Sequence, residues 1–139
     1  VFLPMDTSDE AFCEEIIEAS PKPMAKVSLN SLELQWVVRL FSQMDLVISM
    51  RLHGLILASC LAVPVIAISG VTKNTNFLAK LGCEESNIDI QDLSLARFRE
   101  VFNHLWASRA LKKQNIQGTV TAMRKEEEKN FAVLRTFLK

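Results

Sequence analysis

The residues best suited to chemistry stand just after two apolar segments of the chain. Arg51 and His53 follow a segment that ends at Ser49, and Lys73 follows a second segment that ends at Ser69. A guanidinium can hold a carboxylate or a phosphate with two parallel hydrogen bonds, and an imidazole exchanges protons near neutral pH. These residue types predict a site for an anionic ligand, to which the two serine hydroxyls would add hydrogen bonds.

Each of these residues also has an ordinary structural explanation. Arg51 could pair with a nearby acid, His53 could cap a helix or pack in the core, and Lys73 could be a solvated loop residue. Ser49 and Ser69 are of a type that commonly closes turns. The sequence leaves both explanations open, and it favours ligand roles for Arg51 and His53 because they stand together at a predicted strand end.

Short apolar runs alternate along the chain with longer helical patterns. Strands are expected at residues 1–3, 25–29, 46–49, 63–69 and 88–90, and helices at 6–19, 31–41, 51–61, 74–81, 95–113 and 120–138. This order predicts an α/β fold, namely a Rossmann-like parallel sheet with helices on both faces. Ligands bind such sheets at the carboxyl ends of the strands, which is where the candidate site residues are expected to lie.

Several local patterns sharpen this expectation. Asn30 is expected to cap the second helix, and Gly82 to end the fourth. The helix at 51–61 is apolar nearly all round, which predicts that it is buried together with Cys60. Gly118 and Thr119 are expected to separate the last two helices.

Length and composition bound the class of protein. The chain has 139 residues, enough for one domain, and 49% of them are hydrophobic. The 16 basic and 16 acidic side chains balance, so we expect no nucleic-acid partner. Three widely spaced cysteines form no metal-binding pattern, so no metal is expected. The sequence has neither a Gly-x-Gly-x-x-Gly nor a Walker motif, so no nucleotide cofactor is expected. No run is long and apolar enough for a membrane span, and the reducing cytoplasm is the expected compartment.

Residues 45–54 and 62–69, followed by Lys73 and residues 77–82, resemble the polysaccharide pyruvyl transferase family. The step Arg51-Leu52-His53-Gly54 followed by Val63-Pro64-Val65-Ile66 is its most specific part. The resemblance extends, less specifically, over most of the chain. It implies the C-terminal half of an enzyme with two facing Rossmann-like halves, the GT-B arrangement, as part of exopolysaccharide or cell-wall biosynthesis.

The resemblance also implies a reaction and its partners. The family transfers the enolpyruvyl carbons of phosphoenolpyruvate to a sugar, where they form a ketal. Matched by position, Arg51 and His53 correspond to the donor-site pair, with His53 as the catalytic residue, and Lys73 corresponds to a lysine of the same site. The acceptor would be a glycan or a lipid-linked sugar, which would place the protein at the inner face of the membrane. The loop departs from the family pattern, because Gly70-Val71-Thr72 precedes the lysine in place of Tyr-Asp-Pro.

Residues 1–139 are accordingly expected to form a single Rossmann-like domain, a fragment without its N-terminal half, with a closing helix at residues 119–139. Such a fragment is expected to be inactive alone, and its exposed inter-domain face would favour a homo-oligomer. Two other functions stay open from the sequence. One is half of a GT-B glycosyltransferase that uses a nucleotide-sugar, and the other is a degenerate binding module without catalysis.

Overall fold

The computed structural model describes residues 1–137, and the chain divides into two compact units, Val1–Leu40 and Phe41–Lys139. The first unit contains helix α1 (Thr7–Ala19) and the short helical turn η1 (Leu29–Ser31). Helix α2 (Leu34–Ser42) spans the boundary between the units. Asn30 lies inside η1 and not at the start of α2, so the predicted cap is wrong.

The first unit is held together by an isolated backbone bridge and an ion-pair cluster. Phe2 and Lys26 form a single parallel bridge. This bridge stands where strands were predicted at residues 1–3 and 25–29, and neither full strand forms. The Lys26 ammonium lies 3.0 Å from a carboxylate oxygen of Glu10 and also contacts Glu14. These contacts fix the bridge against α1, whose first turn is capped by the Asp6 carboxylate through the Ser8 N–H.

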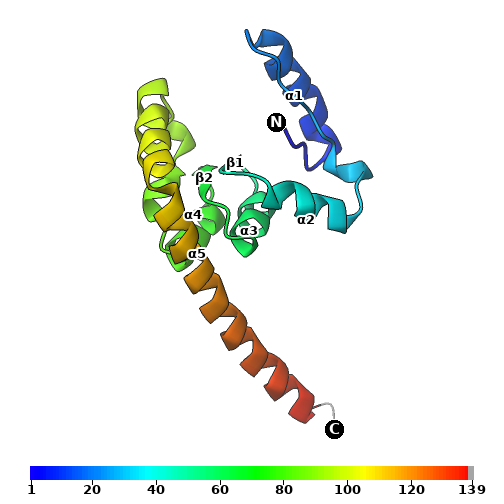
Figure 1. The fold of residues 1–139 in the computed structure, drawn as a ribbon, viewed down its shortest axis with the longest axis vertical. Coiled ribbons are helices and arrows are strands. Elements are labelled where there is room, and N and C mark those ends of the chain that lie inside the picture. Colours follow the sequence, from blue (N-terminus) through cyan, green and yellow to red (C-terminus); the bar gives the residue numbers. More distant parts are fainter. Residues whose placement is uncertain (138–139) are drawn as a thin grey trace. The chain divides into compact units, whose positions relative to one another are not determined.

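The second unit contains a three-stranded parallel sheet in the order β1-β2-β3, of which β1 and β2 are labelled in Figure 1. Its elements in chain order are β1 (Val47–Ser49), α3 (Leu52–Cys60), β2 (Val65–Ile68), α4 (Thr72–Leu81), η2 (Glu84–Ser86), β3 (Asn87–Ile88), η3 (Ile90–Asp92) and α5 (Leu95–Phe137). Each strand is followed by a helix or a helical turn. This arrangement confirms the predicted Rossmann-like α/β class.

Both faces of the central strand β2 are covered. Ile66 and Ile88 pack with Val101 and Leu105 of α5 in one buried cluster. Because successive strand side chains alternate, Val65 and Ala67 point to the opposite face, and both are buried as well. The unbroken apolar run of β2 therefore belongs to a strand that is covered on both faces, as the sequence predicted.

β1 and α3 are less enclosed than the sequence predicts. β1 is an edge strand, since among the described residues it pairs only with β2. Ile48 pairs with Ile66 and so lies on the same face, beyond the cover of α5, where its side chain is 44% exposed. In α3, Leu55 and Ala58 are buried, but Ile56 and Cys60 are exposed. The prediction that α3 and Cys60 are wholly buried is therefore wrong.

A single helix replaces the two that were expected at the end of the chain. α5 runs unbroken from Leu95 to Phe137, straight through Gly118. Ile116 is buried two residues before the glycine, so packing of this part of the helix outweighs the weak helix propensity of one glycine. The predicted end of the last helix at Leu138 lies outside the described residues.

The same substitution at two glycines is expected to change stability in opposite directions. Gly118 is helical and a methyl group there would meet open space, so Gly118→Ala is expected to stabilise the fold by about 0.5–1 kcal/mol. Gly82 ends α4 with φ +69°, a conformation that an L-residue resists, so Gly82→Ala is expected to destabilise it by about 1 kcal/mol. Urea unfolding of both variants measures the change in the free energy of unfolding. A change of the same sign and size in both would contradict the prediction.

η2 is tied to α5 by an ion pair between Glu85 and Lys112. Burial raises the pKa of the Glu85 carboxyl, but the hydrogen bond from Lys112 and its positive charge outweigh that effect and hold the pKa below its ordinary value. A carboxyl group with a lowered pKa in the folded state stabilises the fold above its unfolded pKa. That stabilisation is lost as the pH falls through the folded value.

Glu85→Gln is therefore expected to lower stability at neutral pH, and the gap to the unmodified protein should close as the pH falls below 4.5 and through the lowered pKa. The effect is expected to be at most about 1 kcal/mol, because the pair is partly exposed. Urea unfolding over a series of pH values measures the gap. Glu84→Gln is the matched control, and a gap that persists in acid would contradict the assignment.

Candidate functional site

The site begins with two matching turns at the carboxyl ends of β1 and β2. In the first turn, the Ser49 hydroxyl accepts a hydrogen bond from the Arg51 N–H at 3.1 Å and donates one to the Arg51 carbonyl at 2.9 Å. In the second, the Ser69 hydroxyl accepts a hydrogen bond from the Val71 N–H at 3.1 Å. The serines thus end both strands in the same way, each with a side chain that holds the backbone N–H two residues on.

Each turn leads directly into a helix whose start lacks a side-chain cap. Arg51 and Val71 are the residues at the N-cap positions of α3 and α4, and neither side chain accepts a hydrogen bond from the first helical turn. The N–H groups of a helix start carry partial positive charge and favour anions. Because β1 and β2 are parallel neighbours, with Ser49 beside Ala67, both helix starts lie at the same edge of the sheet.

The basic candidate residues belong to these two starts. Arg51 precedes the first residue of α3, His53 is the second residue of α3, and Lys73 is the second residue of α4. All three side chains are exposed. The structure therefore brings the predicted site residues to one sheet edge, from two adjacent loops, as the sequence analysis expected from the alternation of strands and helices.

Asn74 joins the two loops and was missed by the sequence analysis. Its side chain is fully buried, and its Nδ2 donates a hydrogen bond to the Met50 carbonyl at 2.9 Å. Its Oδ1 is also buried and has no hydrogen-bond partner among the described residues. A contact between residues 24 positions apart leaves no local signal in the sequence.

Asp89 adds a carboxylate near the same edge. It follows β3, and its Oδ1 accepts a hydrogen bond from the Gln91 N–H at 2.9 Å, which caps η3. This oxygen lies 3.8 Å from the position that a Cβ atom on Gly70 would take. Glu85, which precedes β3, pairs instead with Lys112 of α5.

Within residues 1–137 there is no group of three or more His, Cys, Asp or Glu side chains placed to hold a metal ion. In that same part of the chain, no helix combines the length and the apolar character that crossing a membrane requires.

The fold and the site together define a Rossmann-like α/β protein with a cationic, anion-favouring strand edge. Residues 2–70 match the family model described as Polysaccharide pyruvyl transferase, and this match supports the family that the sequence resembles. The family name supports a pyruvyl transferase that acts on a polysaccharide, and it implies a glycan acceptor. No curated protein and no solved structure matches the chain significantly.

The matched segment has a limit that matters for the site. It includes Arg51 and His53 and ends at Gly70, so Lys73 falls outside it. The resemblance that was expected over most of the chain is thus confirmed for residues 2–70. The position of Lys73 rests on the geometry of α4 alone.

Proposed function

We propose that this chain carries the donor side of a transferase that moves the pyruvyl group of phosphoenolpyruvate to a sugar of a polysaccharide or of a lipid-linked glycan precursor. The observation that carries the proposal is the pair of uncapped helix starts, α3 and α4, at one sheet edge, with Arg51, His53 and Lys73 on them. Phosphoenolpyruvate bears a carboxylate and a phosphate, and two adjacent cationic helix starts suit two anionic groups.

In this proposal each basic residue has its own task. Arg51 holds one anionic group with its guanidinium, and Lys73 neutralises charge on the phosphate as it leaves. Ser49 and Ser69 contribute through the turns that their hydroxyls fix, which set the two helix starts in place. His53 is the general acid and base, because it is the titratable side chain next to the bound donor.

The chemistry requires balanced proton transfers. One sugar hydroxyl adds to C2 of the enolpyruvyl group while C3 gains a proton, which turns the methylene into a methyl group. The bond between C2 and the phosphate oxygen then breaks, and a second sugar hydroxyl bonds to C2 to close the ketal. Its proton leaves with inorganic phosphate. His53 would deliver the proton to C3 and accept the proton of an attacking hydroxyl.

The acceptor and the opposite wall of the cleft are part of the same proposal. The facing half of a GT-B enzyme would bind the sugar, so we expect this chain to bind the donor alone and to show no turnover without that half. A cytoplasmic enzyme at the inner face of the membrane would reach lipid-linked acceptors there.

An amide chemical-shift titration tests the donor assignment. Phosphoenolpyruvate is expected to give saturable shifts at residues 49–54 and around Lys73, and Arg51→Ala should abolish them. Lys73→Ala is expected to weaken binding, whereas Lys80→Ala in the last turn of the same helix should not. If both substitutions weakened binding of phosphoenolpyruvate equally, the attraction would be a general effect of positive charge and not that of a specific site.

A second titration with a uridine nucleotide-sugar separates the other functions. Shifts at the same edge with the nucleotide-sugar alone would favour a glycosyltransferase half, in which Asp89 is the acid placed nearest to hold ribose hydroxyls. If neither ligand caused chemical-shift changes, either in this chain or in a protein with both halves, a binding module without catalysis would be favoured.

A further inference from the structure

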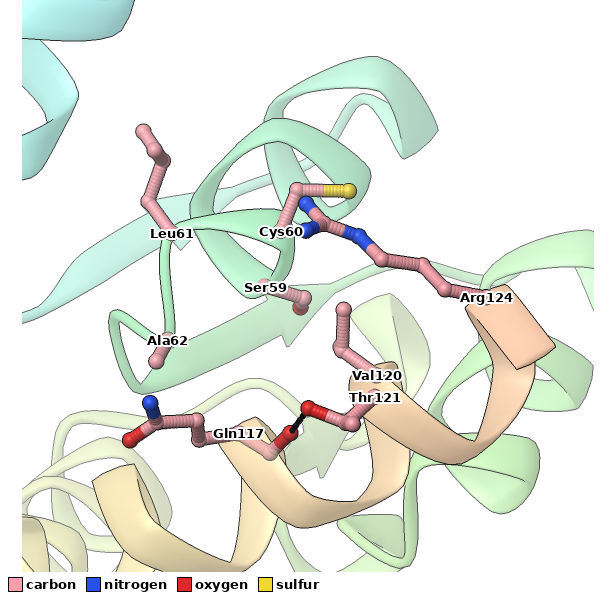
Figure 2. A pocket seen from close by; sticks show the side chains of 8 residues that line it. All are labelled: Ser59, Cys60, Leu61, Ala62, Gln117, Val120, Thr121 and Arg124. Carbon is pink, nitrogen blue, oxygen red and sulfur yellow. Dashed lines mark hydrogen bonds between the residues drawn. The ribbon is translucent and has the colours of Figure 1, made fainter.

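A pocket lies at the opposite end of α3 from Arg51 and His53. It has a volume of about 200 Å³ and opens between the end of α3 and the middle of α5 (Figure 2). A cavity of about 150 Å³ is enough to take a ligand of the size of benzene. Five residues of α3, which rise by about 1.5 Å each, lie between His53 of the candidate donor site and Ser59 of this pocket.

Ser59 gives this pocket an unsatisfied polar group. The residue is 1% exposed, and its Oγ is buried with no hydrogen-bond partner among the described residues. In Figure 2 the hydroxyl lies between α3 and α5, facing Val120 and Thr121. The Thr121 hydroxyl does not serve it, since that group donates to the Gln117 carbonyl at 2.7 Å. A buried hydroxyl left without a partner costs stability, and it calls for an explanation such as a bound ligand.

Arg124 gives the pocket its charge. Its side chain reaches from α5 towards Cys60 at the end of α3, and none of the residues that line the pocket is acidic (Figure 2). Within the described chain Arg124 has no ion pair or hydrogen bond of its side chain. A guanidinium beside a hydroxyl donor, with no carboxylate to neutralise it, suits an oxyanion.

The backbone of the pocket wall is strained at one residue, Ala62. Ala62 follows the end of α3 with φ 58°, and it is the one residue other than glycine with positive φ among those described. α4 ends with the same bonding pattern but has Gly82 in the equivalent place. The bonds from Ala62 and Val63 also occupy the carbonyls of Ser59 and Ala58, which limits the repulsion that a helix end exerts on an anion.

We propose that this pocket binds a small oxyanion, a phosphate or a carboxylate, with Arg124 as its counter-charge and the Ser59 hydroxyl as a hydrogen-bond donor. The pocket and the donor site lie at different ends of α3 and share no residue. The proposal therefore stands apart from pyruvyl transfer.

Cys60 supplies a direct assay of this pocket. It lines the pocket and is exposed, whereas Cys13 and Cys83 are buried. The rate at which neutral iodoacetamide alkylates Cys60 in the 139-residue chain is therefore expected to fall saturably when inorganic phosphate or acetate is added at constant ionic strength. Protection by only one of the two anions would identify the head group.

Three variants decide whether the protection comes from the proposed site. Arg124→Gln should abolish it, and Lys125→Gln, an equal loss of charge at the next position of α5, should leave it unchanged. Ser59→Ala should weaken the apparent affinity up to about tenfold, since one hydrogen bond is lost. Absence of saturable protection, or equal protection in Arg124→Gln, would overturn the proposal. Chemical shifts induced by phosphoenolpyruvate at residues 49–54 would be unaffected by either result.

Discussion

His53→Ala is expected to lower pyruvyl transfer by about 10²–10⁴-fold, the loss that follows when a general acid and base is removed. The measurement is release of inorganic phosphate from phosphoenolpyruvate, in the presence of a glycan acceptor, by a protein that combines this chain with the proposed facing half. The His53 side chain is exposed at the second position of α3, so its loss removes no core contact. The midpoint of urea unfolding should therefore be the same in the variant and in the unmodified protein.

His104 provides the matched control for this experiment. It is the other histidine of the chain, and it lies exposed on α5, far along the sequence from the two strand ends. His104→Ala is expected to keep normal turnover. If His53→Ala retained near-normal turnover as well, the catalytic role proposed for His53 would be wrong, and its imidazole would at most help to bind the donor.

Asn74→Asp is expected to destabilise the fold by about 3 kcal/mol at neutral pH. The substitution replaces the donor of the 2.9 Å bond to the Met50 carbonyl with an acceptor, and it places a carboxylate where the side chain is fully buried. An unpaired buried acceptor alone costs about 1–3 kcal/mol, and a buried charge adds to that. Urea unfolding at neutral pH measures the loss.

The pH dependence of this variant gives a second readout. Burial should raise the pKa of the introduced carboxyl above its unfolded value, so the folded state binds the proton more tightly and stability recovers as the pH falls. The protonated group can also donate to Met50. Asn76→Asp, two residues on and exposed, is the control and is expected to change stability little. Equal losses in both variants would show that Asn74 has no special place between the loops.

The sequence predicts the site region well because its signals there are local. Two apolar runs set β1 and β2, and the helices that follow place Arg51, His53 and Lys73 at one edge without any long-range information. The left-handed Gly82 at the end of α4 is predictable for the same reason, since one residue determines the turn. The roles of these residues towards a ligand stay predictions.

The features that sequence reasoning misses depend on contacts between distant segments. Asn74 contacts Met50, 24 residues away, and Cys60 is exposed and lines a pocket between α3 and α5. Gly118 indicated a break, but the burial of Ile116 two residues earlier outweighs the helix propensity of a single residue. In each case tertiary packing decides what the local pattern leaves open.

The exposed edge of β1 bears on how the protein behaves in concentrated solution. Along Val47–Ser49 the outward N–H and C=O groups meet no other strand among the described residues, and Ile48 adds an apolar side chain beside them. Such an edge is a template on which a strand of another molecule can align, and proteins commonly blunt it with lysine or proline. β1 carries neither, and its shortness is its main protection. Self-association of the chain in concentrated solution is therefore expected to begin along this row of backbone groups.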